Sequence, residues 1–444
     1  NASIGGAIAQ LDGKLNVNYC NFLNNNATYY GGAIYNIYAT LNIYQSNFQY
    51  NSAIDGGALY VDNSTNLKIQ SSNFTNNIAI LGGVIYTYQD NVFTNTNNYF
   101  NNNYAVNGTT IYYQPDPIIR LSNNQSKVIY TNYTYTNYIP SYYNLKDYGY
   151  LTTVKNQGDS GSCWALSAMA SLESCILKAN GGTYDLSEEN LKNLMAEFSQ
   201  YDYADSYPND GGLNEMVYGY LAGWLGPVNE TQEAFDVYST VSPVLDNVLN
   251  VQNILTLRRS SYTDNNAIKL AVLNYGAVAV GMHYDDDYLK FDSYYYNGAE
   301  SIDHGVCIVG WDDTYSKSNF KNVPAGNGAW IVRNTWGPDW GDDGYFYVSY
   351  YDTRLAQLNL DDAYTFIFND STKYDKNYQY DYVTMTDYLS TGSKTAYYSV
   401  QYNSTGNEYL EAFSTYFNTT TDYTANIYVN NSLKYTQTGY SNSG

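Results

Sequence analysis

The stretch that decides the fold of the catalytic part of this chain runs from Gln157 to Ser167 and reads Gln-Gly-Asp-Ser-Gly-Ser-Cys-Trp-Ala-Leu-Ser. From Cys163 onward, apolar residues recur at helical spacing, so the pattern predicts a helix that begins at this cysteine. Free amide groups and the helix dipole at a helix N-terminus favour a thiolate. Cys163 is therefore a candidate nucleophile.

A thiolate nucleophile needs a nearby base, and the chain contains only two histidines, His283 and His304. His304 opens an apolar segment that is typical of a buried strand. Asn334 follows a second such segment and is a candidate for orienting the imidazole. Trp336, two residues later, is expected to shield the hydrogen bond between His304 and Asn334 from water.

These three segments, in this order, resemble the papain family of cysteine peptidases over residues 139–357. The resemblance implies a two-lobed α+β fold and hydrolysis of peptide bonds through a thioester acyl-enzyme. It implies that Cys163 is the nucleophile, that His304 is the general base and then the acid, and that Asn334 orients His304. Gln157 would donate to the oxyanion together with the backbone amide of Cys163.

The resemblance also implies a set of substrate-binding residues, which comprises a glycine pair that lets substrate pair as a strand, the lining of the main specificity pocket, and a covering tryptophan. These residues are Gly211, Gly212, Leu213, Asn214, Gly281, Ile302, Gly305 and Trp336. One departure is that Ser160 stands where the family usually has a cysteine, and its partner is also missing from residues 208–210. Because both cysteines are missing together, we expect this chain to have lost the disulfide as a unit. The loss should lower the stability of the loop by about 2–4 kcal/mol.

Residues 1–115 contain a repeat. Gly5-Gly6-Ala7-Ile8 returns at residues 31–34, 56–59 and 82–85, while Phe22, Phe48, Phe74 and Phe100 keep a spacing of 26. A fixed period of this size predicts stacked units, here one coil of a parallel β-helix per repeat with inward-facing phenylalanines. The segment resembles the right-handed β-helix repeats of microbial adhesin-like surface proteins.

The remaining segments are predicted from composition and pattern. Residues 116–138 are interpreted as a linker or as the tail of a pro-segment. Residues 358–444 resemble the lectin-like β-sandwich that follows the papain-type domain in some clostridial cell-wall peptidases. The segments that carry this resemblance or its β pattern are 363–368, 378–381, 410–417 and 425–429. We expect the chain to be a piece of a longer protein, because residue 1 falls within a repeat.

The charge balance excludes one class of partner and suggests a location. The net charge is −22, from 20 Lys+Arg against 42 Asp+Glu, so we expect no binding to nucleic acid. No apolar run reaches about 20 residues, so no membrane span is expected in this fragment. An uncharged polar surface with recurring Asn-x-Ser/Thr sequons indicates an extracellular, cell-surface glycoprotein.

No cofactor is required by this chemistry. His283 beside Asp285, Asp286 and Asp287 leaves a metal cluster open as an alternative to a plain acidic loop, with calcium as the candidate ion. Cys20, Cys175 and Cys307 are expected to be structural thiols.

The sequence therefore predicts an extracellular, surface-associated cysteine endopeptidase. Its partners would be proteins of the cell envelope or the surroundings, with surface glycans as a second class. One alternative is an adhesin or glycan-binding surface protein in which the peptidase fold is silent. Another is a thiol acyltransferase, although the Asn334 and Trp336 pairing argues against it.

Overall fold

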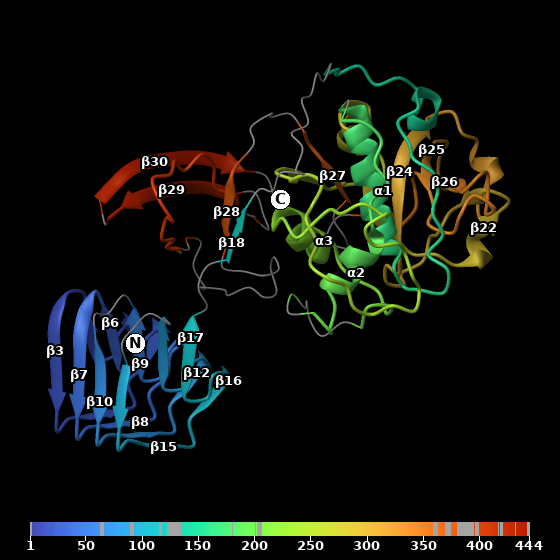
Figure 1. Ribbon diagram of the computed structural model, residues 1–444. Helices are drawn as coiled ribbons and strands as arrows, with labels where there is room; N and C mark the ends of the chain where they lie inside the picture. The colour runs from blue at the N-terminus through green and yellow to red at the C-terminus, as the bar shows by residue number, and fades with distance from the viewer. Residues whose placement is uncertain are drawn as a thin grey trace. The chain divides into compact units, whose positions relative to one another are not determined.

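The computed structural model divides the chain into two compact units, residues 1–117 and 118–444 (Figure 1). The residues that the structure describes are 2–62, 66–88, 93–114, 118–121, 135–179, 181–199, 201, 207–357, 363–368, 374–379, 395, 399–415, 417, 421–430 and 432–441.

The first unit is a parallel β-solenoid, as predicted from the repeat. Its three longer sheets have the strand orders β14-β10-β7-β3, β15-β11-β8-β4 and β17-β13-β9-β6-β2, and two further pairs are β1-β5 and β12-β16. In the first sheet the strands are β3 (Gly13–Asn18), β7 (Ala39–Tyr44), β10 (Leu67–Gln70) and β14 (Phe93–Thr96). In the second they are β4 (Asn21–Leu23), β8 (Asn47–Gln49), β11 (Asn73–Thr75) and β15 (Tyr99–Asn101). In the third they are β2 (Ile8–Gln10), β6 (Ile34–Ile37), β9 (Leu59–Asp62), β13 (Ile85–Tyr88) and β17 (Ile111–Gln114). The two pairs use β1 (Ala2–Ile4), β5 (Ala27–Tyr30), β12 (Ile78–Leu81) and β16 (Tyr104–Asn107).

Like residues stack on like residues along the solenoid. The rings of Phe22, Phe48, Phe74 and Phe100 stack face to face with centroids 4.6, 4.7 and 5.3 Å apart. At one corner the side-chain amide of each asparagine donates to the side-chain oxygen of the next, in the order Asn25, Asn51, Asn77 and Asn103. Stacked rings and amide ladders satisfy both the apolar and the polar groups of each coil, which is why the period is kept.

The second unit contains the sheet and helices expected for a two-lobed fold. The sheet has the order β20-β27-β21-β24-β25-β26-β23-β22, with β19 beside β24. Its strands are β19 (Tyr142–Asn144), β20 (Ile254–Leu257), β21 (Val278–Met282), β22 (Leu289–Lys290), β23 (Ser293–Tyr294), β24 (His304–Asp312), β25 (Ala329–Arg333), β26 (Tyr345–Ser349) and β27 (Ala363–Phe366). The helices are α1 (Cys163–Lys178), α2 (Glu188–Leu194), α3 (Asn214–Ala222) and α4 (Asn266–Asn274), with short 3-10 turns η1 (Leu145–Tyr148), η2 (Asp286–Tyr288) and η3 (Lys317–Asn319).

Helix α1 is the central element of this unit. It packs against β24, β21 and β27 of the sheet and also against α2 and α3. All of these elements except β21 are labelled in Figure 1. Its side chains from Trp164 to Ile176 are buried without interruption. A helix that is apolar on most of its surface must be covered on several sides, and here the sheet and the smaller helices cover it.

Two boundaries differ from the sequence interpretation. The strand at 363–366, assigned above to a lectin-like domain, is β27 and pairs with β20 and β21. All four of its residues are buried, which explains why it belongs to the core of the peptidase sheet. The supposed linker 116–138 contains β18 (Ile118–Leu121), which pairs with β28 (Lys376–Gln379). A strand partner some 250 residues away cannot be inferred from local composition.

The C-terminal segment is partly as expected. Residues 425–429 lie in β29 (Thr421–Val429), which forms an antiparallel hairpin with β30 (Ser432–Ser441). The strand predicted at 410–417 is wrong over 410–415, where the backbone is irregular and the side chains are largely exposed. Alternation of apolar and polar residues favours a strand only where one face of the strand is buried, and these side chains are not buried. Of the match at 378–381, residues 378 and 379 lie in β28, and the rest falls outside the described residues.

Candidate active site

The candidate nucleophile lies where the sequence predicts it. Cys163 is the first residue of α1 and is partly exposed. The start of the helix lies so close to β24 that a Cβ atom at Gly305 would come within 3.1 Å of the Cys163 carbonyl group. Glycine at this position therefore lets the strand that carries His304 reach the helix terminus.

His304 and Asn334 meet through the register of two neighbouring strands. His304 begins β24, and Asn334 follows β25, which pairs with it antiparallel. The Nε2 atom of His304 lies 2.7 Å from Oδ1 of Asn334. Trp336 stacks on the imidazole with ring centroids 4.6 Å apart, so the predicted cover over this hydrogen bond is present. His304 is 7% and Asn334 1% exposed.

The segment before the helix is bound to the segment that carries Asn334. The backbone N–H of Gln157 donates to the carbonyl of Thr335 at 2.8 Å, and the Thr335 hydroxyl donates to the Gln157 side-chain oxygen. The side-chain amide of Gln157 donates to the Ser160 carbonyl at 2.7 Å. These contacts place a side-chain N–H donor in the same turn as Cys163.

Burial dominates the protonation of the two reactive groups. It raises the pKa of the Cys163 thiol, and hydrogen bonds from the backbone N–H groups of Gly305 and Trp164 offset part of this rise. Burial lowers the pKa of His304, against the opposing effects of the Asn334 hydrogen bond and the Asp303 charge. Both directions favour a neutral thiol and imidazole, whereas the helix N-terminus alone led us to expect a thiolate. Desolvation of the charged forms is the reason for the difference.

The residues predicted to bind substrate fall into two groups. Gly281 pairs with Gly305 in adjacent strands, next to the nucleophile, and Ile302 lies just before them. Gly211 has a φ of +121°, and a Cβ atom at Gly212 would lie 2.2 Å from the indole of Trp164. The glycine pair is thus required by an unusual backbone angle and by close approach to the residue after the nucleophile.

Leu213 and Asn214 lie at the N-terminus of α3. Leu213 is 53% exposed, which leaves it free to contact a ligand. Their proposed place in a specificity pocket with Gly281, Ile302 and Gly305 remains a prediction.

The missing disulfide is replaced by a polar contact. The Ser160 hydroxyl donates to Oδ1 of Asn209 at 2.8 Å, and the backbone N–H of Gly161 donates to the Asn209 carbonyl at 2.9 Å. The loop before the glycine pair is therefore tied to the loop before the nucleophile by hydrogen bonds.

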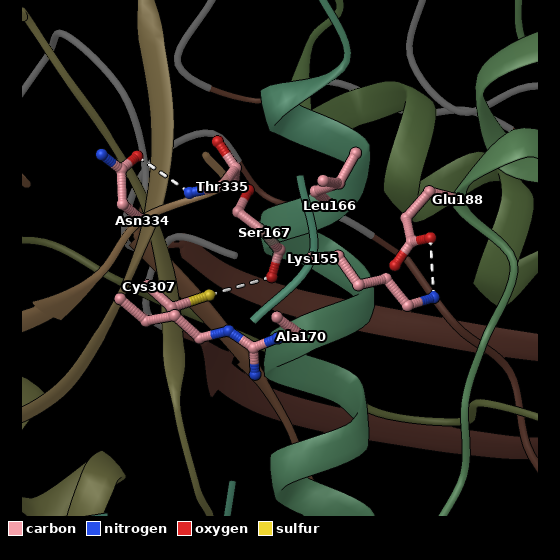
Figure 2. A pocket seen from close by; sticks show the side chains of 9 residues that line it. Lys155, Leu166, Ser167, Ala170, Glu188, Cys307, Asn334 and Thr335 are labelled. Carbon is pink, nitrogen blue, oxygen red and sulfur yellow. Dashed lines mark hydrogen bonds and ion pairs between the residues drawn. The ribbon is translucent and has the colours of Figure 1, made fainter. Parts of the chain in front are cut away.

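Sequence reasoning missed a group of buried charges behind the reactive residues. A small polar cavity, shown in Figure 2, is lined by Lys155, Leu166, Ser167, Ala170, Glu188, Cys307, Arg333, Asn334 and Thr335. Lys155 Nζ lies 2.9 Å from the Glu188 carboxylate and 3.2 Å from that of Glu230. Arg333 donates to the backbone of Thr152 and Thr153. The sequence did contain one sign of these buried charges, because Arg333 ends an otherwise apolar strand pattern.

The remaining thiols and the second histidine have local partners. All four cysteines are free. Burial raises the pKa of Cys307 to about 12, and its thiol donates to the carbonyl of Ser167. Cys20 occupies the ladder position of Ser46 in the solenoid, and its backbone N–H donates to that hydroxyl. These contacts agree with structural roles for the two thiols.

His283 lies beside Asp303 rather than in a metal cluster. Its Nδ1 atom is 2.8 Å from the Asp303 carboxylate. In the described part of the chain, no group of three or more His, Cys, Asp or Glu side chains is arranged to hold a metal ion. The Asp285 carboxylate instead accepts the backbone N–H of Asp287 within its own turn.

Comparisons with known proteins agree with this geometry. The chain is 30% identical to cysteine proteinase 1 of Zea mays, over 48% of this chain and 57% of the relative. It is 32% identical to cysteine proteinase 15A of Pisum sativum, over 48% of this chain and 58% of the relative. The chain thus spans about three-fifths of the length of the curated relatives it matches.

A solved structure of the cysteine protease and lectin-like domains of Cwp84, a surface layer associated protein of Clostridium difficile, is also similar. It shows 31% identity, covers 53% of this chain and 53% of that chain, and has a TM-score of 0.47.

Residues 139–366 match the model of the papain family cysteine proteases. This span exceeds half of the chain and includes the nucleophile, the histidine and the asparagine described above. It also ends with β27, which agrees with the corrected boundary of the sheet. The chain therefore belongs to the papain family of cysteine proteases.

Proposed function

We propose that this protein is an extracellular, surface-associated cysteine endopeptidase that hydrolyses proteins of the cell envelope or the surroundings. The observation that carries the proposal is the contact between His304 and Asn334, 2.7 Å long and covered by Trp336, at the end of α1 where Cys163 lies.

The tautomer of His304 follows from the donors around Asn334. The side-chain oxygen Oδ1 of Asn334 accepts the backbone N–H of Thr335 at 2.8 Å, and the same oxygen faces the imidazole of His304. His304 Nε2 must then carry the proton and donate it to that oxygen. The lone pair of Nδ1 is left to accept the thiol proton of Cys163 as sulfur attacks the substrate carbonyl carbon.

The developing oxyanion has two candidate donors. The backbone N–H of Cys163 is at the first position of a helix, where no intrahelical acceptor exists. The side-chain amide of Gln157 is held in the same turn by Thr335. Donors that are fixed before reaction stabilise the charge without reorganisation.

The cycle closes with conservation of atoms and protons. Protonated His304 gives its proton to the leaving amine as the C–N bond breaks, which leaves a thioester on Cys163. Water then loses a proton to His304 and attacks the thioester carbonyl. The acid product leaves, and the sulfur of Cys163 recovers the proton.

The extracellular location is supported by composition and by sequons. The chain has few cations, and the sequon asparagines Asn73 and Asn107 are exposed in the solenoid. No helix in the described residues could cross a membrane. Surface glycans are the second class of partner that we propose, to be sought by glycan-array binding of the inactive Cys163→Ala protein.

Substitution of the nucleophile tests the reaction. We expect Cys163→Ala to abolish peptide hydrolysis and leave the melting temperature nearly unchanged, since Cys163 is not a core residue and alanine is a good helix former at the start of α1. The matched control is Cys20→Ala, which should retain full turnover. Hydrolysis by the Cys163→Ala protein would refute the assignment. Transfer to added amines in excess of hydrolysis would instead favour an acyltransferase.

A further inference from the structure

A buried lysine lies at the junction of two loops that border the active site. Lys192, in α2, is 0% exposed. Its ammonium group faces the glycine loop, which we define as residues 208–212, and the flanking segment, defined as residues 235–239. We propose that Lys192 is a positioning residue that holds the glycine loop in its substrate-binding position. This inference rests on the proposed peptidase function.

The ammonium group has partners in three parts of the chain. The Glu189 carboxylate lies 3.1 Å away, within α2 itself. Nζ donates to Oδ1 of Asn209 at 3.1 Å in the glycine loop. It also donates to the carbonyls of Asp236 and Ser239, each at 3.2 Å, in the flanking segment. Phe235 adds its ring at 5.4 Å.

The lysine acts on the glycine loop through one side chain. Asn209 accepts from both Lys192 and Ser160 on the same oxygen, and its amide donates to the Val237 carbonyl at 2.9 Å. Its backbone carbonyl accepts from Gly161. Asn209 therefore joins the turn before the nucleophile, the flanking segment and α2, two residues before Gly211.

This network stands where the papain-like pattern would have a disulfide. A disulfide fixes two points covalently, whereas an ammonium group offers three donors and can fix several backbone segments together. An ammonium group is buried only when it is paired, and loss of its partners leaves an uncompensated charge. The contacts of Lys192 therefore stabilise only the arrangement in which the glycine loop and the flanking segment both face the ammonium group.

The inference predicts a particular kinetic change. The glycine loop would bind substrate backbone equally in the ground state and the transition state, so its loss should raise KM and spare kcat. For Lys192→Met we expect KM for a peptide substrate to rise on the order of tenfold, with kcat changed by less than about twofold. Alkylation of Cys163 by iodoacetamide should keep its rate, because this small reagent does not use the loop.

Lys269→Met is the matched control. Lys269 is also buried, at 5% exposure, and pairs with Asp313 beside Trp311 and Tyr350, but it belongs to α4. It should lower the melting temperature without changing KM. In the double variant Lys192→Met with Asn209→Leu, the effects on KM should be less than additive, because both act through one contact.

Hydrogen exchange of the full chain gives a readout that is independent of turnover. Lys192→Met should reduce protection in the glycine loop and the flanking segment while α1 keeps its protection. Unchanged protection in both loops, or a kcat loss with unchanged KM, would overturn the inference. Absence of hydrolysis by the wild-type protein would count against the proposed function, and the exchange comparison would still decide on Lys192.

Discussion

At the scale of single residues, His304 and Asn334 should contribute unequally to catalysis. His304 transfers the proton, whereas Asn334 fixes its tautomer. We expect His304→Ala to lower kcat/KM by about 10²–10⁴-fold, the range of general acid–base catalysis. Asn334→Ala should cost less, because the stack with Trp336 still holds the ring. Steady-state kinetics on one peptide substrate checks this, and equal losses would contradict the division of roles.

The pKa of His304 determines the acid limb of the activity profile. Burial lowers this pKa below its ordinary value of 6.5, and only the neutral imidazole can accept the thiol proton. Activity should therefore persist below pH 6.5 and fall as pH drops through the lowered pKa. Asp303→Asn removes a charge that raises the pKa, so the limb of kcat/KM against pH should move lower still. An acid limb above pH 6.5 would show that burial does not dominate.

At the scale of structural elements, Asp55 in one coil of the solenoid should destabilise that coil when its carboxyl group is ionised. Burial raises the pKa of Asp55 to about 7, so its folded pKa lies above the unfolded value near 3.9. Ionisation then costs stability in the folded state only. The unfolding free energy should be greatest near pH 4 and fall as pH rises to about 7. Asp55→Asn should flatten this slope in hydrogen exchange of solenoid amides, and an unaltered slope would exclude Asp55 as its source.

A core residue of the same solenoid offers a second test. Phe74 is 0% exposed and stacks between Phe48 and Phe100. Phe74→Ala should cost about 3–5 kcal/mol, the usual range for a buried aromatic ring. Chemical denaturation followed by exchange of β11 and its neighbours measures this. The exposed Tyr99→Ala is the control and should change the unfolding free energy little.

Some elements of the fold could be predicted from the sequence and others could not. The solenoid and the starts of α1 and β24 followed from strict spacing, because each needs a particular residue at a particular step. Pairings between distant segments did not follow, since β18 and β28 are separated by about 250 residues and neither has a distinctive pattern. The place of Lys192 was equally hidden, because a lysine in a helix pattern ordinarily indicates a solvated face.

At the scale of the whole molecule, the four free thiols predict that reducing agents do not change the stability of the fold. No disulfide links the residues that the structure describes, so the loops around the active site are held by hydrogen bonds and buried charges. In the Cys163→Ala protein, where the reactive thiol is absent, the melting temperature should be the same with and without dithiothreitol. Calorimetry under both conditions checks this. A drop of several degrees on reduction would reveal a crosslink that the described contacts do not contain.

The ladders of the solenoid make its length adjustable. Because Phe stacks on Phe and Asn bonds to Asn at every step, an additional coil would meet the same partners as the coils beside it. Insertion of about 26 residues would then extend the stack by one strand spacing, about 4.8 Å, without redesign of either neighbour. Duplication or deletion of a single coil should therefore change the length of the solenoid in equal steps of one strand spacing, with the same contacts restored at the new junction.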